Sequence, residues 1–167
     1  LKAFIMKIQL RHSYSEIISL EYLCSAWEVF AVGKKSKPDV QIFARNLMDN
    51  IVELHQSLVN KTYRHAGYES FYITDPKRRH IHKAGVRDRL LHHAVYRILY
   101  SFFDRTFIAD SYSCRNAKGT HKAVGRFGAL VNQVSKNHIR TCWVLKCHIR
   151  KFFASIDHQI LLSIMQR

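Results

Sequence analysis

The sequence predicts an α+β fold that is mostly helical, with one basic β-hairpin and one further strand. Apolar residues recur every three to four positions over several segments, which is the period of an amphipathic helix. Between two of these segments lies a short aromatic and basic stretch with a turn at its centre, which is typical of a hairpin. Hydrophobic residues make up 47% of the 167 residues, so a core can form and a disordered basic tail is excluded.

Two helices are expected in the first third of the chain. Ser19 precedes a helical pattern over residues 20–32, and Gly33 follows it as a helix stop. Pro38 suits the first turn of a second helix. We expect this second helix to be continuous, because its apolar residues keep the helical period over Phe43, Leu47, Ile51, Leu54 and Leu58.

A hairpin and a third helix should follow. Residues 68–74 and 79–83 have strand-like composition and are separated by a turn at 75–78, Asp-Pro-Lys-Arg. The next helix has the apolar positions Val86, Leu90, Ala94, Ile98 and Phe102. Its other face is strongly basic.

The last third predicts two helices and a buried strand. Thr120 can cap a helix that buries Ala123, Phe127, Leu130 and Val134. Residues 141–149 have the β-branched and aromatic content of a buried strand. Asp157 is expected to cap a final helix.

The charge balance indicates a polyanionic partner. The chain has 27 Lys and Arg against 12 Asp and Glu, a formal net charge of +15. Basic residues concentrate on the hairpin and the helix after it, downstream of Tyr68, Phe71 and Tyr72. Such a surface suits phosphates and stacked bases, whereas the alternative is an ordinary solvated face. The size of the net charge favours nucleic acid.

Other classes of protein fit the sequence poorly. No apolar run is long enough to cross a membrane, and residues 1–11 lack the features of a signal peptide. The four cysteines have no paired spacing, which argues against a disulfide scaffold. A zinc site is not expected from the loose set His138, Cys142, Cys147, His148 and His158, because the two cysteines would face opposite sides of one strand.

Three blocks of sequence, in order, resemble a known family. Residues 72–81, Tyr-Ile-Thr-Asp-Pro-Lys-Arg-Arg-His-Ile, and residues 87–94, Arg-Asp-Arg-Leu-Leu-His-His-Ala, resemble the fingers segment of bacterial reverse transcriptases. Residues 107–115, together with residues 118–123, resemble their second block, and residues 144–158 resemble polymerase motif A. The resemblance is greatest to the reverse transcriptases of group II introns, retrons and diversity-generating retroelements.

This resemblance implies an RNA-directed DNA polymerase with a right-hand fold in the cytoplasm of a bacterium. Residues 1–135 would form a helical N-terminal region and the fingers, and residues 136–167 the start of the palm. The implied partners are an RNA template, an RNA/DNA duplex and a deoxynucleoside triphosphate, with no membrane. In the family, two Mg²⁺ ions support nucleotidyl transfer.

The resemblance also implies roles for individual residues. Lys77, Arg78 and Arg79 would hold the incoming triphosphate, since guanidinium groups match phosphate oxygens. Phe153 would either gate the sugar of the nucleotide or pack in the core. The remaining implied nucleic-acid contacts are Lys83, Arg87, Arg89 and Arg115, of which Arg115 could instead fix its own loop.

The chain departs from the family at the catalytic position. His148 stands where motif A carries a metal-binding aspartate, and an imidazole is a poor ligand for Mg²⁺. The second catalytic motif does not occur in these 167 residues. The expectation is a truncated, catalytically defective polymerase fragment that binds no metal productively and pairs with its missing half or another chain. One alternative is a non-catalytic RNA-binding module, and another is a metal-dependent nuclease using His148, Asp157 and His158.

Overall fold

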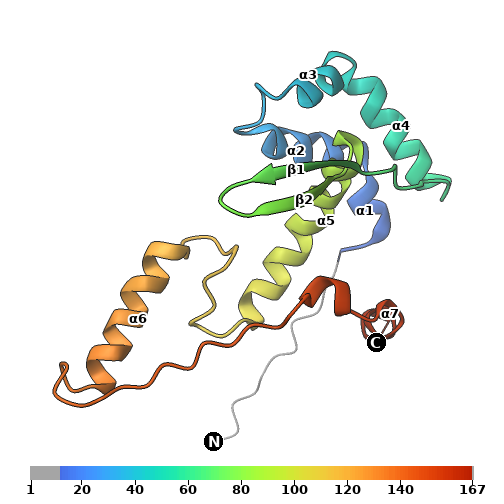
Figure 1. The fold of residues 1–167 in the computed structure, drawn as a ribbon. Helices are drawn as coiled ribbons and strands as arrows, with labels where there is room; N and C mark the ends of the chain where they lie inside the picture. The colour runs from blue at the N-terminus through green and yellow to red at the C-terminus, as the bar shows by residue number, and fades with distance from the viewer. Residues whose placement is uncertain (1–11, 167) are drawn as a thin grey trace, which may run out of the picture. The chain divides into compact units, whose positions relative to one another are not determined.

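The computed structural model describes residues 12–166 and divides the chain into two compact units, residues 1–109 and 110–167. Residues 1–11, for which no signal peptide is expected, lie outside the described residues. The fold is α+β, mostly helical, with one two-stranded antiparallel sheet (Figure 1). None of the described helices is both long and apolar enough to span a membrane.

The first unit contains five helices, a hairpin and a short 3₁₀ turn among its described residues. In chain order they are α1 (Tyr14–Ile18), α2 (Leu20–Ala31), α3 (Pro38–Arg45), α4 (Leu47–Val59), β1 (Glu69–Thr74), β2 (Arg78–Lys83), α5 (Val86–Phe103) and η1 (Asp104–Thr106). The predicted helix 20–32 is confirmed as α2. The Ser19 hydroxyl caps it by accepting a hydrogen bond from the Tyr22 amide at 3.2 Å. Gly33 follows in the left-handed region at φ 69°, a conformation that glycine adopts without strain.

The prediction of one continuous helix from Pro38 to Leu58 is wrong, because the backbone leaves the helical region at Asn46. This residue has φ −120° and ψ 46°, so α3 ends before it and α4 begins after it. The Asn50 side chain donates a hydrogen bond to the Phe43 carbonyl at 2.9 Å and satisfies an acceptor next to the break. The apolar period runs through both helices, so it conceals the bend.

The core of the first unit lies between α2, α4 and α5. Leu23, Ile51, Leu54 and Leu90 are completely buried there. The Tyr22 hydroxyl donates to the Ala94 carbonyl at 3.0 Å and so joins α2 to α5. The predicted helix from Val86 is confirmed, with its apolar face in this core.

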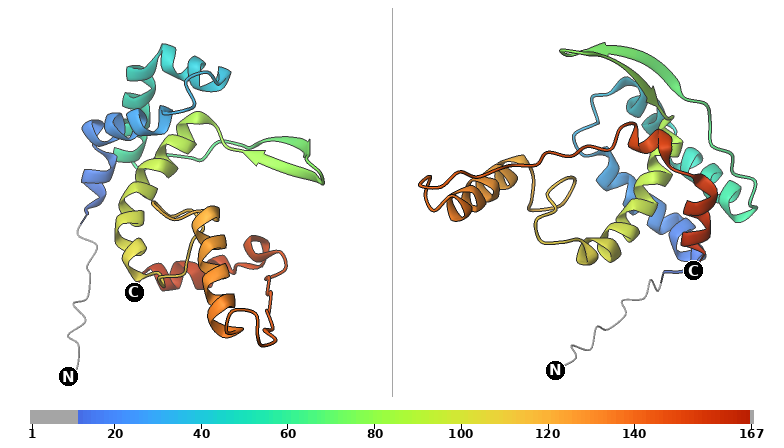
Figure 2. Two further views of the ribbon diagram at one scale, coloured as in Figure 1. Left: turned by 90° about the vertical axis from the view of Figure 1, so that its left-hand side faces the viewer. Right: turned by 60° about the horizontal axis from the view of Figure 1, so that its bottom comes forward.

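The hairpin extends away from these helices (Figure 2). Its strands pair antiparallel from Glu69 with Lys83 to Thr74 with Arg78, around a three-residue turn at 75–77. The predicted hairpin is confirmed to within one residue at each strand. Most of its residues are exposed, so its side chains are available to a ligand.

The second unit contains α6 (Thr120–Val134), the 3₁₀ turn η2 (Phe152–Ser155) and α7 (His158–Met165). The predicted cap of the last helix is confirmed, because Asp157 Oδ1 accepts from the amides of Gln159 and Ile160 at 2.9 and 3.1 Å. For α6 the cap position is Gly119, at φ 98°, so Thr120 is the first helical residue and not the cap.

The prediction that α6 buries an apolar face is wrong. None of its residues is buried, and Phe127 and Val134 are 52% and 62% exposed. The apolar residues of α6 do recur with a helical period, but a helix buries its apolar face only where another element packs against it.

The predicted buried strand and palm strand at 141–149 are also wrong. These residues have no strand partner among the described residues, and Trp143 and Leu145 are 91% and 88% exposed. Strand-like composition expresses how well a side chain fits a half-buried sheet, so it does not form a strand without a neighbouring one.

Candidate nucleic-acid interface

The tip of the hairpin presents cations that pair with no acidic group of the described residues. Lys77 lies in the turn and Arg79 on β2, opposite Ile73. Both residues are exposed, and within residues 12–166 neither forms an ion pair. Arg78 packs its guanidinium over the Tyr72 ring, 4.0 Å from the ring centroid, which leaves its charge uncompensated. The three residues predicted to hold a triphosphate are therefore consecutive at the projecting end of the hairpin, Lys77 in the turn and Arg78 and Arg79 at the start of β2.

The base of the hairpin, by contrast, is held by an acidic residue of helix α3. Asp39, in the first turn of α3, forms an ion pair with Lys83 Nζ at 2.7 Å and accepts a hydrogen bond from the Arg89 guanidinium of α5. Burial acts to raise the pKa of Asp39, but the hydrogen bond from Lys83 and the charges of Arg89 and Lys83 outweigh it and lower that pKa. Lys83 and Arg89, predicted as nucleic-acid contacts, thus tie β2 and α5 to α3.

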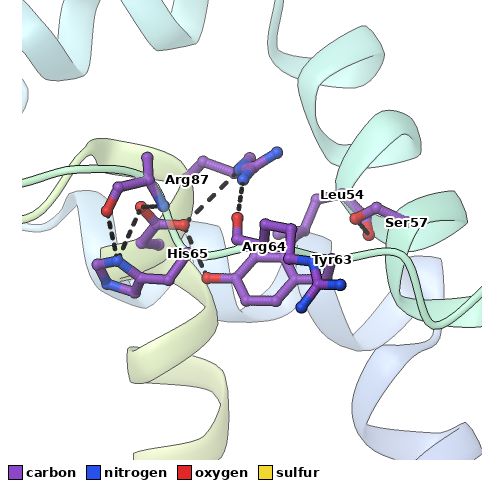
Figure 3. Close-up of polar contacts among 8 residues, drawn as sticks. Leu54, Ser57, Tyr63, Arg64, His65 and Arg87 are labelled. Carbon is purple, nitrogen blue, oxygen red and sulfur yellow. Dashed lines mark hydrogen bonds and ion pairs between the residues drawn. The ribbon is translucent and has the colours of Figure 1, made fainter.

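Arg87 is also engaged inside the first unit. Its Nη2 donates to the Arg64 carbonyl at 2.6 Å, and its guanidinium lies 5.2 Å from the centroid of the Tyr63 ring. Figure 3 shows Arg87 among the polar contacts of the segment between α4 and β1, with Tyr63 and His65 close by. The predicted contact with nucleic acid would require Arg87 to leave these partners.

Asp88, which the sequence did not single out, is the centre of this polar cluster. It is completely buried and accepts from the Tyr63 hydroxyl at 2.7 Å and from the Ala66 amide at 3.1 Å, with His65 Nδ1 at 3.9 Å. Burial alone would raise the pKa of Asp88, but the two hydrogen bonds, with His65 and Arg87 nearby, lower it. The carboxylate fixes the segment that leads from α4 into the hairpin.

The hydrogen bond between Tyr63 and Asp88 makes the stability of the fold depend on pH in the alkaline range. Burial and the hydrogen bond to Asp88 raise the pKa of Tyr63 from 10.0 to about 12. The unfolded chain therefore loses this proton first, and the stability linked to it is complete below pH 10.0 and lost as the pH rises toward about 12. We expect urea unfolding followed by circular dichroism to show a steeper loss in this window for the wild type than for Tyr63→Phe. Equal slopes would contradict this assignment.

The candidate residues of the second unit do not form a site of their own. His148 is exposed in the unpaired segment, and Phe153 is 83% exposed, with its ring 5.2 Å from that of Phe152. Phe153 is therefore not packed in a core. Arg115 Nη1 donates to the Ser111 carbonyl at 3.2 Å, which matches the alternative that it fixes its own loop.

The described residues around His148 do not bring metal-ligating side chains together. In the part of the chain that the structure describes, no three His, Cys, Asp or Glu residues lie close enough to hold a metal ion. Asp157, the nearest carboxylate in sequence to His148, already uses Oδ1 to cap α7. The same observation counts against the nuclease alternative, because His148, Asp157 and His158 do not converge.

Comparison with known proteins assigns no family. No protein-family model matches the chain, and no curated protein matches it.

Proposed function

We propose that the chain is a reverse transcriptase-like fingers region that binds an RNA template, an RNA/DNA duplex and a deoxynucleoside triphosphate. The observation that carries the proposal is the exposed cationic tip of a hairpin whose base is braced. Lys77 and Arg79 have no acidic partner among the described residues, whereas Lys83 and Arg89 both form ion pairs with Asp39. The cations at the base therefore hold the hairpin in place, whereas the cations at the tip are available to bind a ligand.

The chemistry of the tip suits phosphate oxygens. A guanidinium group donates two parallel hydrogen bonds to a phosphate, and an ammonium group adds a mobile point charge. The net charge of +15 attracts a polyanion over a longer range and raises the rate of encounter. Binding of this kind releases counterions and weakens steeply with salt.

The proposal includes binding without polymerisation. His148 occupies the position of the metal-binding aspartate, and the described residues offer no alternative set of oxygen ligands. We expect the 167-residue chain to show no extension of a primer on an RNA template with Mg²⁺ and all four deoxynucleotides. Measurable extension on a sequencing gel would overturn this part of the proposal.

Removing one tip cation should weaken binding in a salt-dependent way. We expect Arg79→Ala to lower the affinity for a primer–template duplex about 3- to 10-fold and to reduce the salt slope of log K by about 0.7 to 0.9, since one phosphate contact is lost. Fluorescence anisotropy at several salt concentrations measures both quantities.

Arg45→Ala is the matched control for this experiment. Arg45 is an exposed arginine at the end of α3, so its removal changes the net charge equally without touching the hairpin. If the two variants weaken binding equally, the nucleic acid responds only to the net charge of the protein and not to the hairpin tip, and the fingers proposal fails.

A non-catalytic RNA-binding module is the second candidate. It is favoured by the first unit, which has its own core and carries the whole hairpin. This candidate predicts salt-dependent RNA binding that a deoxynucleoside triphosphate does not compete with. Competition by the triphosphate at the tip, lost in Arg79→Ala, supports the polymerase-like function instead.

A further inference from the structure

A row of rings runs from α5 along one face of the hairpin to its tip. Its members are aromatic or imidazole side chains, ending in one guanidinium group. We call it the ring row, and it consists of His92, His65, Tyr68, His82, His80, Tyr72 and Arg78.

The hairpin part of the row follows from strand alternation. Tyr72 and His80 are direct cross-strand partners, and His82 lies two residues beyond His80 on the same face. The Tyr72 and His80 rings stack with centroids 4.5 Å apart and planes inclined by 14°. The His80 and His82 centroids are 4.3 Å apart, and Arg78 covers the Tyr72 ring at the tip. The strands therefore bring three rings and the planar guanidinium group of Arg78 together on one face of the hairpin.

The loop before β1 continues the row toward α5. The Tyr68 ring meets that of His82 edge-on at 6.4 Å and that of His65 at 4.9 Å. The His65 ring stacks on that of His92 with centroids 5.3 Å apart and planes inclined by 18°. Next to this end is a groove of about 420 Å³ whose lining includes Leu91, Val95 and both of these histidines.

The row lies on the surface and makes no part of the core. All seven residues are exposed, and Tyr68 and Tyr72 are 59% and 58% exposed. The opposite face of the hairpin carries Phe71, Ile73 and Ile81, together with Glu69, Arg79 and Lys83. Exposed rings contribute little to folding, so a ligand that covers them explains the arrangement better than stability does.

We infer that the ring row binds the unpaired bases of single-stranded RNA by stacking. Each base has a flat apolar face that stacks on aromatic and imidazole rings, whereas bases within a duplex already stack on each other and cannot reach the row. Lys77 in the turn and Arg78 at the end of the row then take phosphates of the same strand, as the net positive charge favours. Imidazole nitrogens along the row can bond a ribose 2′-hydroxyl, which both donates and accepts, so RNA is the expected strand.

This inference rests on the proposed function only in requiring nucleic acid as the ligand. It adds that bases as well as phosphates are recognised and that a single strand is preferred to a duplex. It does not depend on polymerase ancestry, because the contacts belong to the hairpin and α5 alone.

The first test uses the unmodified 167-residue chain. Fluorescence anisotropy compares a labelled uridine-rich RNA strand with an abasic strand of the same length and charge, and with a fully paired duplex. We expect the base-bearing strand to bind at least about 10-fold more tightly than the abasic strand. Equal binding of the two strands would overturn the stacking inference, while an effect of Arg79→Ala on both would leave the proposed function intact. A DNA strand of the same sequence that binds as tightly as RNA would overturn the assignment to RNA.

The second test compares the two faces of β1. Tyr72→Leu and Phe71→Leu make the same aromatic-to-aliphatic change at adjacent positions on opposite faces. We expect Tyr72→Leu to weaken binding of the base-bearing strand about 5- to 10-fold, with an unchanged salt slope, and not to affect the abasic strand. Phe71→Leu should bind normally. An equal loss in both variants would mean that the hairpin as a whole is perturbed, and would count against the ring row.

Discussion

Asp88→Ala is expected to lower the free energy of unfolding by about 3 kcal/mol, because it removes a fully buried carboxylate that accepts hydrogen bonds from two partly buried donors. The Tyr63 hydroxyl and the Ala66 amide would lose their acceptor, and water would have to enter the site to replace it. Urea unfolding followed by circular dichroism at neutral pH measures the change. A loss below about 1 kcal/mol would show that the cluster relaxes without cost.

Two variants divide this effect into its parts. Tyr63→Phe removes one hydrogen bond and should cost about 1 kcal/mol. Asp88→Asn keeps the shape and one acceptor oxygen but removes the charge, and should fall between the other two variants. If Tyr63→Phe costs as much as Asp88→Ala, the tyrosine contact alone carries the stability, and the hydrogen bond to the Ala66 amide contributes little.

The Asp88 cluster also matters for the surface that we propose binds RNA. The segment that it holds includes His65, whose ring joins the hairpin part of the ring row to His92. We therefore expect a loosened segment to disturb the row at its α5 end, whereas the stacked pair of Tyr72 and His80 is held by strand pairing.

Local signals in the sequence predict the elements of the first unit well. Ser19 and Gly33 delimit α2, and the Asp-Pro turn with its flanking alternation defines the hairpin. Asp157 caps α7 for the same local reason. A helix cap or a tight turn is determined by a few neighbouring residues, so the local sequence is sufficient to predict it.

The incorrect predictions depend on contacts that the local sequence does not contain. The break at Asn46 interrupts a helical period that is otherwise unbroken. The segment 141–149 has the composition of a strand, but strand formation requires a partner that periodicity does not supply. Apolar spacing identified the side of α6 suited to burial, but it does not determine whether another element covers that side.

The sequence predicted which segments carry the basic residues of the candidate site, but it did not predict which of these residues are paired with a carboxylate. Net charge and the basic run indicated the hairpin and α5 as a unit. Only the fold shows that Arg89 is paired with Asp39, 50 positions away in sequence, while Arg79 is left exposed. The ring row was missed for a similar reason, because alternation along one strand places His80 and His82 on one face but does not show that Tyr72 lies opposite.

Asp39→Asn is expected to have opposite effects on stability and on binding. The carboxylate holds both Lys83 and the Arg89 guanidinium, and Arg89 Nε is already buried without a hydrogen-bond partner. Loss of the charge should lower the free energy of unfolding by about 1 to 3 kcal/mol. The pKa of Asp39 is lowered in the folded state, so the stability that this group contributes is present above the ordinary carboxyl pKa and is lost as the pH falls. The difference between wild type and variant should therefore shrink in acid.

Binding of RNA should become tighter in the same variant. Arg89 loses its carboxylate partner and Lys83 keeps only Glu69, at 3.8 Å, so the affinity at low salt should rise about 2- to 5-fold and the salt slope should steepen. Asp49→Asn is the control, since it removes an equal charge from an exposed position in the first turn of α4. Anisotropy titrations of the three proteins compare them directly. If Asp39→Asn binds more weakly than the control, Lys83 and Arg89 contact RNA from the positions in which Asp39 holds them, and the separation of bracing from binding cations is wrong.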